Sequence, residues 1–230
     1  MTLSYLNDFF SLFYPRLCNA CNQALIKEEQ CICSFCKYQL PKTRFHLERE
    51  NQLTRVFWGR VNIETATSLL YFHKGSMVQN LIHKFKYKGK KDIGVYLGNM
   101  LGSSLKVSPL WQPVDVIIPV PLHEKKFHQR GFNQSEIFAT GLSETFEKPL
   151  LKNNLVRISH TQTQTRKTRF KRWENVSNVF DLLNPNELQG KNVLIVDDVV
   201  TTGSTLEACC EKILSIKGTK VWVATIAMAY

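Results

Sequence analysis

The chain has 230 residues, a hydrophobic content of 43% and a formal net charge of +11. This length suits one α/β domain with a small additional module, and the hydrophobic content excludes a globally disordered chain. The positive charge favours anionic partners such as phosphate compounds, nucleic acid or acidic proteins, although an ordinary basic protein would also show it.

The first 15 residues predict a short amphipathic helix that packs on the rest of the chain. They lack a basic leader and carry Asp8 among apolar residues, a pattern unlike that of a signal peptide. No apolar run approaches the roughly 20 residues that a membrane span needs. Because the chain has seven cysteines and no signal peptide, we expect a cytoplasmic protein in a reducing compartment, with no membrane span.

Two Cys-x-x-Cys pairs follow, Cys18 with Cys21 and Cys33 with Cys36. Each pair can place two sulfurs on one cation, and two pairs complete a tetrahedron, so we expect a structural zinc site. The module is too small to fold on a core of its own, and the metal would carry much of its stability. A redox-active pair is the main alternative. Cys31 lies nearby and could replace Cys33 as a ligand.

Beyond the cysteines the pattern alternates between strands and helices. We expect strands at 66–72, 114–118, 193–196 and 221–229, with helices at 77–88, 95–105, 133–142 and 206–217. The run at 193–196 is continuous and apolar, as in a strand covered on both faces. The alternation predicts an α/β fold with a mostly parallel, doubly wound sheet. We divide the chain into an N-terminal helix and zinc-binding module, residues 1–55, and an α/β domain, residues 56–230.

A basic segment follows the strand at 114–118. Pro119 and Val120 lie at the strand end, and the segment after them carries Lys125 and Arg130. Because the guanidinium group is a planar fork, Arg130 can hold a phosphate through two parallel hydrogen bonds, as Lys cannot. Gly131 permits a tight turn before the next helix. A solvated basic loop without a ligand is the alternative interpretation.

Residues 157–176 are polar and basic, without a helical or strand period, and include Arg169 and Arg172. Such a run is usually a solvated arm. Since it lies between strands that form the ligand crevice, a loop that closes over bound phosphates is the functional interpretation. Phe170 and Trp173 interleave with the charges, a mixture that also suits single-stranded DNA, and residues 84–91 repeat it.

The most specific stretch is VLIVDDVVTTGST, residues 193–205. Its apolar strand runs into Asp197 and Asp198, at the sheet edge where open α/β sheets bind ligands. Two carboxylates can accept hydrogen bonds from vicinal ribose hydroxyls and help to hold Mg²⁺, although two acids at a strand end are often only solvated. The next residues suit one phosphate group, because they supply hydroxyls, backbone N–H groups and the start of a helix. They are Thr201, Thr202, Gly203, Ser204 and Thr205.

This stretch resembles the ribose-5-phosphate loop of the type I phosphoribosyltransferases, in which the two acids meet the ribose hydroxyls and the loop holds the 5-phosphate. The whole chain is similar to the ComF-type phosphoribosyltransferase-like proteins. The similarity lies in the paired cysteines, Lys86-Tyr87, IPVPL at 118–122, RGFNQ at 130–134 and the stretch 197–205. Arg166 and Lys167 after Gln164-Thr165 depart from the family pattern, as does Cys31.

The resemblance implies the type I phosphoribosyltransferase fold, phosphoribosyl pyrophosphate bound with Mg²⁺, and a role in DNA uptake during natural transformation. Two functions remain open. One is transfer of a ribosyl group with loss of pyrophosphate, assisted mainly by charge neutralisation from Mg²⁺, Arg130 and loop cations, since no residue stands out as a general base. The other is a non-catalytic module that binds single-stranded DNA and docks a helicase-like competence protein.

Overall fold

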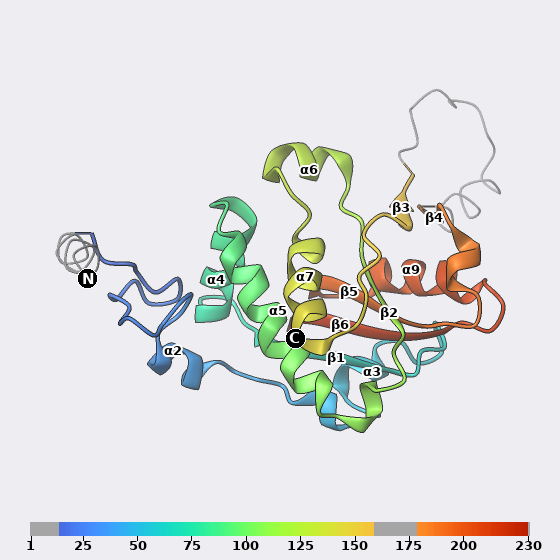
Figure 1. The fold of residues 1–230 in the computed structure, drawn as a ribbon, viewed down its shortest axis with the longest axis horizontal. Coiled ribbons are helices and arrows are strands. Elements are labelled where there is room, and N and C mark those ends of the chain that lie inside the picture. The colour runs from blue at the N-terminus through green and yellow to red at the C-terminus, as the bar shows by residue number, and fades with distance from the viewer. Residues whose placement is uncertain (1–13, 159–178, 230) are drawn as a thin grey trace, which may run out of the picture.

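A four-stranded parallel sheet forms the centre of the protein in this computed structural model, which describes residues 14–158 and 179–229 (Figure 1). Its strand order is β1–β6–β5–β2, and all three pairings are parallel. The bounds are Thr65–Phe72 for β1, Val116–Pro119 for β2, Asn192–Val200 for β5 and Lys220–Ala229 for β6. The four expected strands are therefore present, and β5 runs four residues further than the apolar run indicates.

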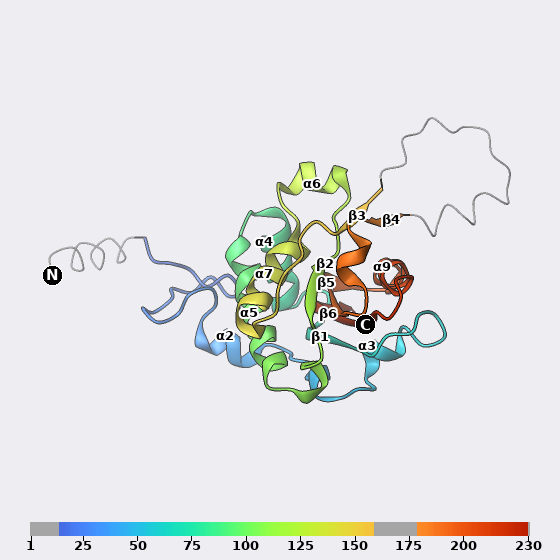
Figure 2. The ribbon, with the colours of Figure 1, turned by 45° about the vertical axis from the view of Figure 1, so that its right-hand side comes forward.

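Helices cover both faces of the sheet (Figures 1 and 2). Alternate residues of β5 enter different cores: Leu194 and Val196 pack in one, Val193 and Ile195 in the other. The first core contains apolar residues of α4 (Met77–Tyr87), α5 (Lys91–Lys106) and α7 (Gln134–Phe146), and the second those of α3 (Gln52–Arg55) and α9 (Ser204–Leu214). This is the doubly wound arrangement that the alternating pattern predicts.

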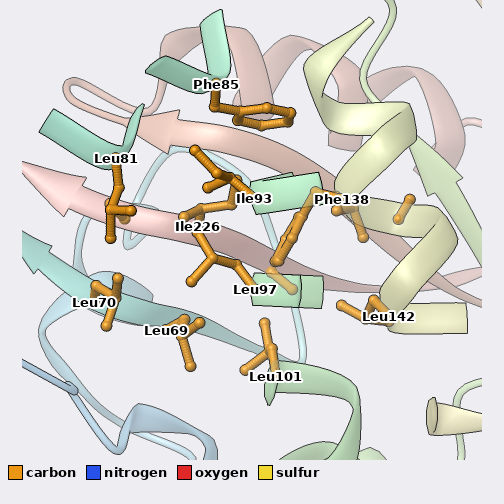
Figure 3. Packing of buried hydrophobic residues seen from close by; sticks show 14 of the residues in the cluster. Leu69, Leu70, Leu81, Phe85, Ile93, Leu97, Leu101, Phe138, Leu142 and Ile226 are labelled. Carbon is orange, nitrogen blue, oxygen red and sulfur yellow. The ribbon is translucent and has the colours of Figure 1, made fainter. Parts of the chain in front are cut away.

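Figure 3 shows the first core from close by, where Leu81 of α4, Leu97 of α5 and Phe138 of α7 gather beside Ile226 of β6. The helices α5 and α7 touch through glycine. A Cβ atom on Gly98 would lie 2.3 Å from the carbonyl oxygen of Phe138, and one on Gly141 would lie 2.2 Å from that of Val95. This close contact fixes α7, and with it the N-terminus of α7 at the carboxyl end of the sheet.

Smaller elements surround the sheet. They are the α-helices α2 (Ser34–Gln39) and α6 (Glu124–Arg130), 3-10 turns at Phe45–Leu47, Pro109–Trp111 and Pro185–Leu188, and an antiparallel pair of strands, β3 (Leu155–Arg157) and β4 (Phe180–Leu182). The helix α6 lies in the segment after Pro119, where a loop is the simpler expectation. His123 caps it by accepting a hydrogen bond from the N–H of Lys125, and Gly131 ends it with φ of 75°.

The cysteine module packs against the first core rather than apart from it. Ile32 and Leu40 belong to the same apolar cluster as residues of α4 and α5. The Asn19 side chain donates a 3.1 Å hydrogen bond to Asp92 of α5, and Lys84 of α4 donates one of 2.6 Å to Asn22. The four-cysteine segment is thus joined to the helix that carries Lys86 and Tyr87.

Two expectations lie outside the described residues: the N-terminal helix and the basic segment 157–176 apart from its first two residues. Within the described ranges, no helix has both the length and the apolar character required to cross a membrane.

Candidate phosphoribosyl site and metal centre

The two adjacent aspartates lie at the carboxyl end of β5, the edge at which parallel sheets bind ligands. The strand continues past them because Val199 and Val200 pair with Ala227 and Met228 of β6. The loop is therefore only Thr201–Gly203, shorter than the 201–205 loop expected, and Ser204 and Thr205 form the first turn of α9. The order of acids, loop and helix is nevertheless the one that the sequence predicts.

The loop between β5 and α9 surrounds a small cavity of about 50 Å³, lined by Asp197 and residues 199–206. Gly203 has φ of 77°, a conformation that favours glycine, and a Cβ atom there would lie 2.9 Å from Val56 Cγ1. The first N–H groups of α9 have no carbonyl partner within their own helix and carry its positive dipole end. This combination suits a small anion.

Arg60 contacts the Thr201–Gly203 loop and the first turn of α9. Its guanidinium donates a 2.8 Å hydrogen bond to the carbonyl of Thr202 and one of 3.4 Å to Ser204 Oγ, and it forms an ion pair with Glu207. The charge of Arg60 is thus neutralised by the acid in the first turn of α9. Arg60 holds the backbone of the loop, while the loop's own N–H groups stay available.

Asp197 is half-buried and carries a perturbed carboxyl group. Its Oδ1 accepts a 2.7 Å hydrogen bond from Ser135 Oγ, at the start of α7, and one of 2.8 Å from the N–H of Asp198. Burial, together with the neighbouring charge of Asp198, raises the pKa of Asp197 to about 7, against the opposing effect of these hydrogen bonds and Lys86. At neutral pH the side chain can therefore both accept and release a proton.

Asp198 has a different partner. Its Oδ2 lies 2.8 Å from the Nζ of Lys86, in the last turn of α4, and the two side chains are 13% and 17% exposed. Of the two acids, only Asp197 lines the cavity of the phosphate loop. The sequence predicts that both acids meet one ribose; in the structure, the second is held by a cation from another helix.

Arg130, at the end of α6, contacts Tyr87, the residue that follows Lys86 in the chain. Its guanidinium donates a 2.7 Å hydrogen bond to Gln134 Oε1 and one of 3.3 Å to the hydroxyl of Tyr87, and it lies 5.2 Å from the centre of the Tyr87 ring. Its Nε is buried without a hydrogen-bond partner. In the described part of the chain, Arg130 forms no ion pair with a carboxylate, so its positive charge is uncompensated.

Only some of the other residues predicted for this site contact β5 or the helices beside it. Pro119 and Val120 lie beside Val196 of β5, since the N–H of Val120 donates a 2.8 Å hydrogen bond to the Val196 carbonyl. Gly131 provides the turn between α6 and α7. Lys125 is exposed on α6, and among the described residues no hydrogen bond or ion pair joins its side chain to either aspartate. Arg169 and Arg172 lie outside the described residues.

A larger hollow of about 500 Å³ opens between α6 and β3, with Leu122, Phe127 and Val156 among its lining residues. Neither aspartate lines it. Asn133 lines it and donates a 3.0 Å hydrogen bond to the carbonyl of Val120, so the hollow adjoins the end of β2. It offers space for a second molecule at the end of β2 rather than a place for the ribose itself.

The four paired cysteines converge. The sulfur atoms of Cys18, Cys21, Cys33 and Cys36 all lie within 4.8 Å of one another, so this cluster could hold a metal ion. Those of Cys21 and Cys33 are 3.8 Å apart. A tetrahedron with metal–sulfur bonds of about 2.3 Å has sulfur–sulfur edges of about 3.8 Å, so the spacing fits a zinc-sized cation.

Backbone N–H groups support the same cluster. The N–H of Cys33 donates a 3.2 Å hydrogen bond to Cys18 Sγ, and that of Cys36 donates one of 3.4 Å to Cys33 Sγ. Burial alone would raise the pKa of Cys18, but its N–H donors bring that pKa down to about 7, which favours the thiolate that binds metals. Burial raises the pKa of Cys31 to about 12, and its sulfur lies outside the cluster.

Two residues of the candidate site, Lys86 and Arg60, were not predicted as site residues from the sequence. Lys86 belongs to KFKYKGKK, residues 84–91, whose mixture of charges and aromatic rings suggested single-stranded DNA. The Lys86-Tyr87 pair, quoted above for the family resemblance, was the available signal. Arg60 stands in a stretch without any motif, and nothing in the sequence could have indicated its contact with the loop at Thr202.

The chain is similar to several known proteins. A family model described as "Phosphoribosyl transferase domain" matches residues 133–229. The DNA utilization protein YhgH of Escherichia coli O157:H7 is 31% identical over 203 residues, 86% of this chain and 84% of that protein. Competence protein F of Haemophilus influenzae is 32% identical over 148 residues, 62% of this chain and 65% of its own length. Competence protein ComFC of Bacillus subtilis is 25% identical over 220 residues, 89% of this chain and 86% of that protein.

Among solved structures, a purine phosphoribosyltransferase from Pyrococcus horikoshii is similar with a TM-score of 0.37 and 22% identity, over 62% of this chain and 76% of that one. The glutamine phosphoribosylpyrophosphate amidotransferase of Bacillus subtilis gives a TM-score of 0.44 and 20% identity, over 62% of this chain and 30% of that one.

The parallel sheet and the family match over residues 133–229 show that the chain has the type I phosphoribosyltransferase fold. A four-cysteine module that could bind zinc precedes it. With the YhgH match across most of both chains, this protein belongs to the ComF family of phosphoribosyltransferase-like proteins.

Proposed function

We propose that this chain binds phosphoribosyl pyrophosphate, or a related phosphoribosyl ligand, together with Mg²⁺, and that it acts in DNA uptake during natural transformation. The observation that supports this choice of ligand is that Asp197 and Asp198 directly precede the Thr201–Gly203 loop and the start of α9. The names of the relatives, which include two competence proteins and a DNA utilization protein, support the biological role.

Each part of the ligand has a matching group. The N–H donors at the start of α9 and the hydroxyls of Thr202 and Ser204 suit the 5-phosphate. Carboxylates accept hydrogen bonds from the ribose hydroxyls. The fixed fork of Arg130 suits the diphosphate. In this proposal the loop positions the ribose ring, and the acids and Arg130 orient its reacting carbon.

The acids also fit Mg²⁺, which prefers oxygen ligands and usually keeps several of its waters. Asp197 Oδ1 accepts hydrogen bonds and Asp198 Oδ2 pairs with Lys86, but the other oxygen of each carboxylate has no such partner in the described structure. These two oxygens, directly or through water, would hold the ion. When bound, Mg²⁺ would neutralise charge on the diphosphate leaving group.

The four-cysteine cluster is proposed as a structural zinc site. With four sulfurs as ligands, no coordination position remains for a substrate. The hydrogen bonds of Asn19 to Asp92 and of Asn22 to Lys84 indicate what the site supports, namely the attachment of the module to α4 and α5.

We further propose that residues 1–55 and 56–230 are the two units of the chain and that it works in the cytoplasm.

A non-catalytic role in binding single-stranded DNA is the second candidate. Two observations favour it: the basic aromatic stretch at 84–91 contains Tyr87, which is 51% exposed, and the names of the relatives concern DNA. In this role the zinc module would dock a helicase-like competence protein. The first candidate has priority because Lys86, a cation of that stretch, is paired with Asp198.

Two titrations distinguish the candidates. Calorimetry with phosphoribosyl pyrophosphate, with and without Mg²⁺, tests the ligand; no detectable heat in either condition would remove the first candidate. A labelled single-stranded oligonucleotide, titrated at several salt concentrations, tests the second. Affinity lost at physiological salt would remove the second, whereas oligonucleotide binding that phosphoribosyl pyrophosphate displaces would mean that both use one surface.

A further inference from the structure

The Lys86–Asp198 pair is an unusual feature for a site that is meant to receive ribose hydroxyls. The ammonium lies 2.8 Å from the carboxylate, and neither side chain is more than 17% exposed. A charge that is largely removed from water needs a partner of the opposite sign. A ligand that takes Asp198 with its hydroxyl groups would therefore leave Lys86 without a counter-charge.

Another cation, Arg130, has no anionic partner in the described structure and contacts Tyr87, the residue after Lys86. Arg130 stacks 5.2 Å from the ring of Tyr87, the residue that follows Lys86, and its two described hydrogen bonds go to neutral oxygens of Gln134 and Tyr87. Its Nε is buried without a partner. Both cations stand at helix ends, Lys86 in the last turn of α4 and Arg130 in the last turn of α6.

The contacts connect these cations to both acids. Asp198 pairs with Lys86; Tyr87 holds Arg130; Arg130 holds Gln134; and Ser135, the neighbour of Gln134, donates to Asp197. The phosphate loop with its cavity adjoins Asp197. If that loop and the acids hold the ribose of phosphoribosyl pyrophosphate, one anionic group remains to meet the cations. It is the diphosphate on the first carbon of the ribose.

On the basis of the function proposed above, we infer that Lys86 exchanges partners on binding. In the free protein it neutralises Asp198; when ribose hydroxyls occupy Asp198, it transfers to the diphosphate, beside Arg130. The exchange makes Lys86 a specificity-determining residue. A ribose 5-phosphate whose hydroxyls take Asp198 Oδ2 displaces Lys86 and supplies no anion at its first carbon, whereas phosphoribosyl pyrophosphate supplies its diphosphate in place of the lost carboxylate.

The test is a comparison of two ligands on three proteins. Wild type, Lys86→Met and Lys88→Met are titrated by calorimetry with ribose 5-phosphate and with phosphoribosyl pyrophosphate, in Mg²⁺. Lys88 is exposed at the same helix end and controls for the loss of one positive charge. We expect Lys86→Met to lower the preference for phosphoribosyl pyrophosphate at least about tenfold, through weaker binding of that ligand and unchanged or tighter binding of ribose 5-phosphate. Lys88→Met should keep the wild-type ratio.

The outcomes separate the two proposals. If wild type binds neither ligand, the proposed function fails. If wild type binds both and Lys86→Met keeps the wild-type ratio, or loses the same factor for both ligands, the proposed function stands and Lys86 is only structural.

A measurement on wild type covers the case in which Lys86→Met does not fold. Lysine acetylation, followed by peptide mass spectrometry, reports the accessibility of Lys86, with Lys88 as the internal reference. Ribose 5-phosphate should increase the labelling of Lys86, since it releases the ammonium without covering it. Phosphoribosyl pyrophosphate should decrease it, and a change in the same direction with both ligands would overturn the exchange.

Discussion

Asp197 and Asp198 are neighbours in β5, yet they have different partners: Asp197 accepts a hydrogen bond from Ser135 of α7, and Asp198 pairs with Lys86 of α4. One acid lacks a cation of its own and has its pKa raised to about 7; the other is neutralised. Above pH 7, the charge of Asp197 should therefore lower the free energy of unfolding, and the charge of Asp198 should raise it.

Replacing Asp197 by Asn should stabilise the protein at alkaline pH. The folded pKa of about 7 exceeds the unfolded value of about 3.8, so the stability associated with the protonated carboxyl is present below pH 4 and lost as pH rises to 7. Asn cannot ionise and avoids this loss. In thermal melts with a chelator present, the advantage of Asp197→Asn over wild type should be larger at pH 8 than at pH 5. Equal differences at the two pH values would contradict the raised pKa.

Replacing Asp198 by Asn should instead destabilise the protein, by about 1–3 kcal/mol, because Lys86 keeps its charge without a counter-ion. The double variant Asp198→Asn with Lys86→Met should recover part of that loss. Urea unfolding of the two single variants and the double variant measures the coupling. The exposed pair of Lys106 and Glu147 is the control, for which Lys106→Met should change stability by less than about 0.5 kcal/mol.

Metal analysis should find about one zinc ion per chain. Cys18→Ser should lose the metal and lower the melting temperature, since that sulfur is one of the four clustered ones and accepts a backbone N–H hydrogen bond from Cys33. Cys31→Ser is the matched control and should retain the metal, because the Cys31 sulfur lies outside the cluster. Retention of full zinc by Cys18→Ser, or its loss in Cys31→Ser, would show that the ligands are assigned wrongly.

Gly98→Ala should destabilise the protein by about 1–3 kcal/mol or more, because its Cβ would meet backbone atoms of α7 at 2.3 Å. The helices would have to separate, and α7 carries Gln134 and Ser135 at the site. Ser103→Ala, on the exposed side of the same helix, should leave stability nearly unchanged. Equal melting temperatures for the two variants would mean that α5 and α7 are less closely packed than described.

The sequence predicted the features that reside in one continuous stretch. Four apolar residues before two acids, a short loop and a helix start form one strand–loop–helix unit, and its order could be derived from 193–205 alone. The loop length was wrong, because β-branched Val199 and Val200 extend the strand through pairing with β6. Spacing alone identified the cysteine pairs, but only the backbone path shows that Cys33, not Cys31, faces the other three sulfurs.

Contacts between distant segments could not be derived in this way. The ion pair of Lys86 with Asp198 depends on how α4 crosses the sheet, and the bond of Arg60 to Thr202 depends on where the chain after α3 passes the loop. Both are set by packing of the apolar cores on either side of the sheet. A pattern of charges within one segment carries no information about which strand end those charges will reach.

Calorimetric titration of phosphoribosyl pyrophosphate with Mg²⁺ tests whether the acids and the loop form a phosphoribosyl site. Wild type should bind, and the variant with both Asp197→Asn and Asp198→Asn should bind at least about 100-fold more weakly, as the loss of two charge-assisted hydrogen bonds implies. Asp181→Asn, on the surface, should bind as wild type does. Equal affinity of wild type and the double variant, with both proteins folded, would mean that the two acids do not form the binding site.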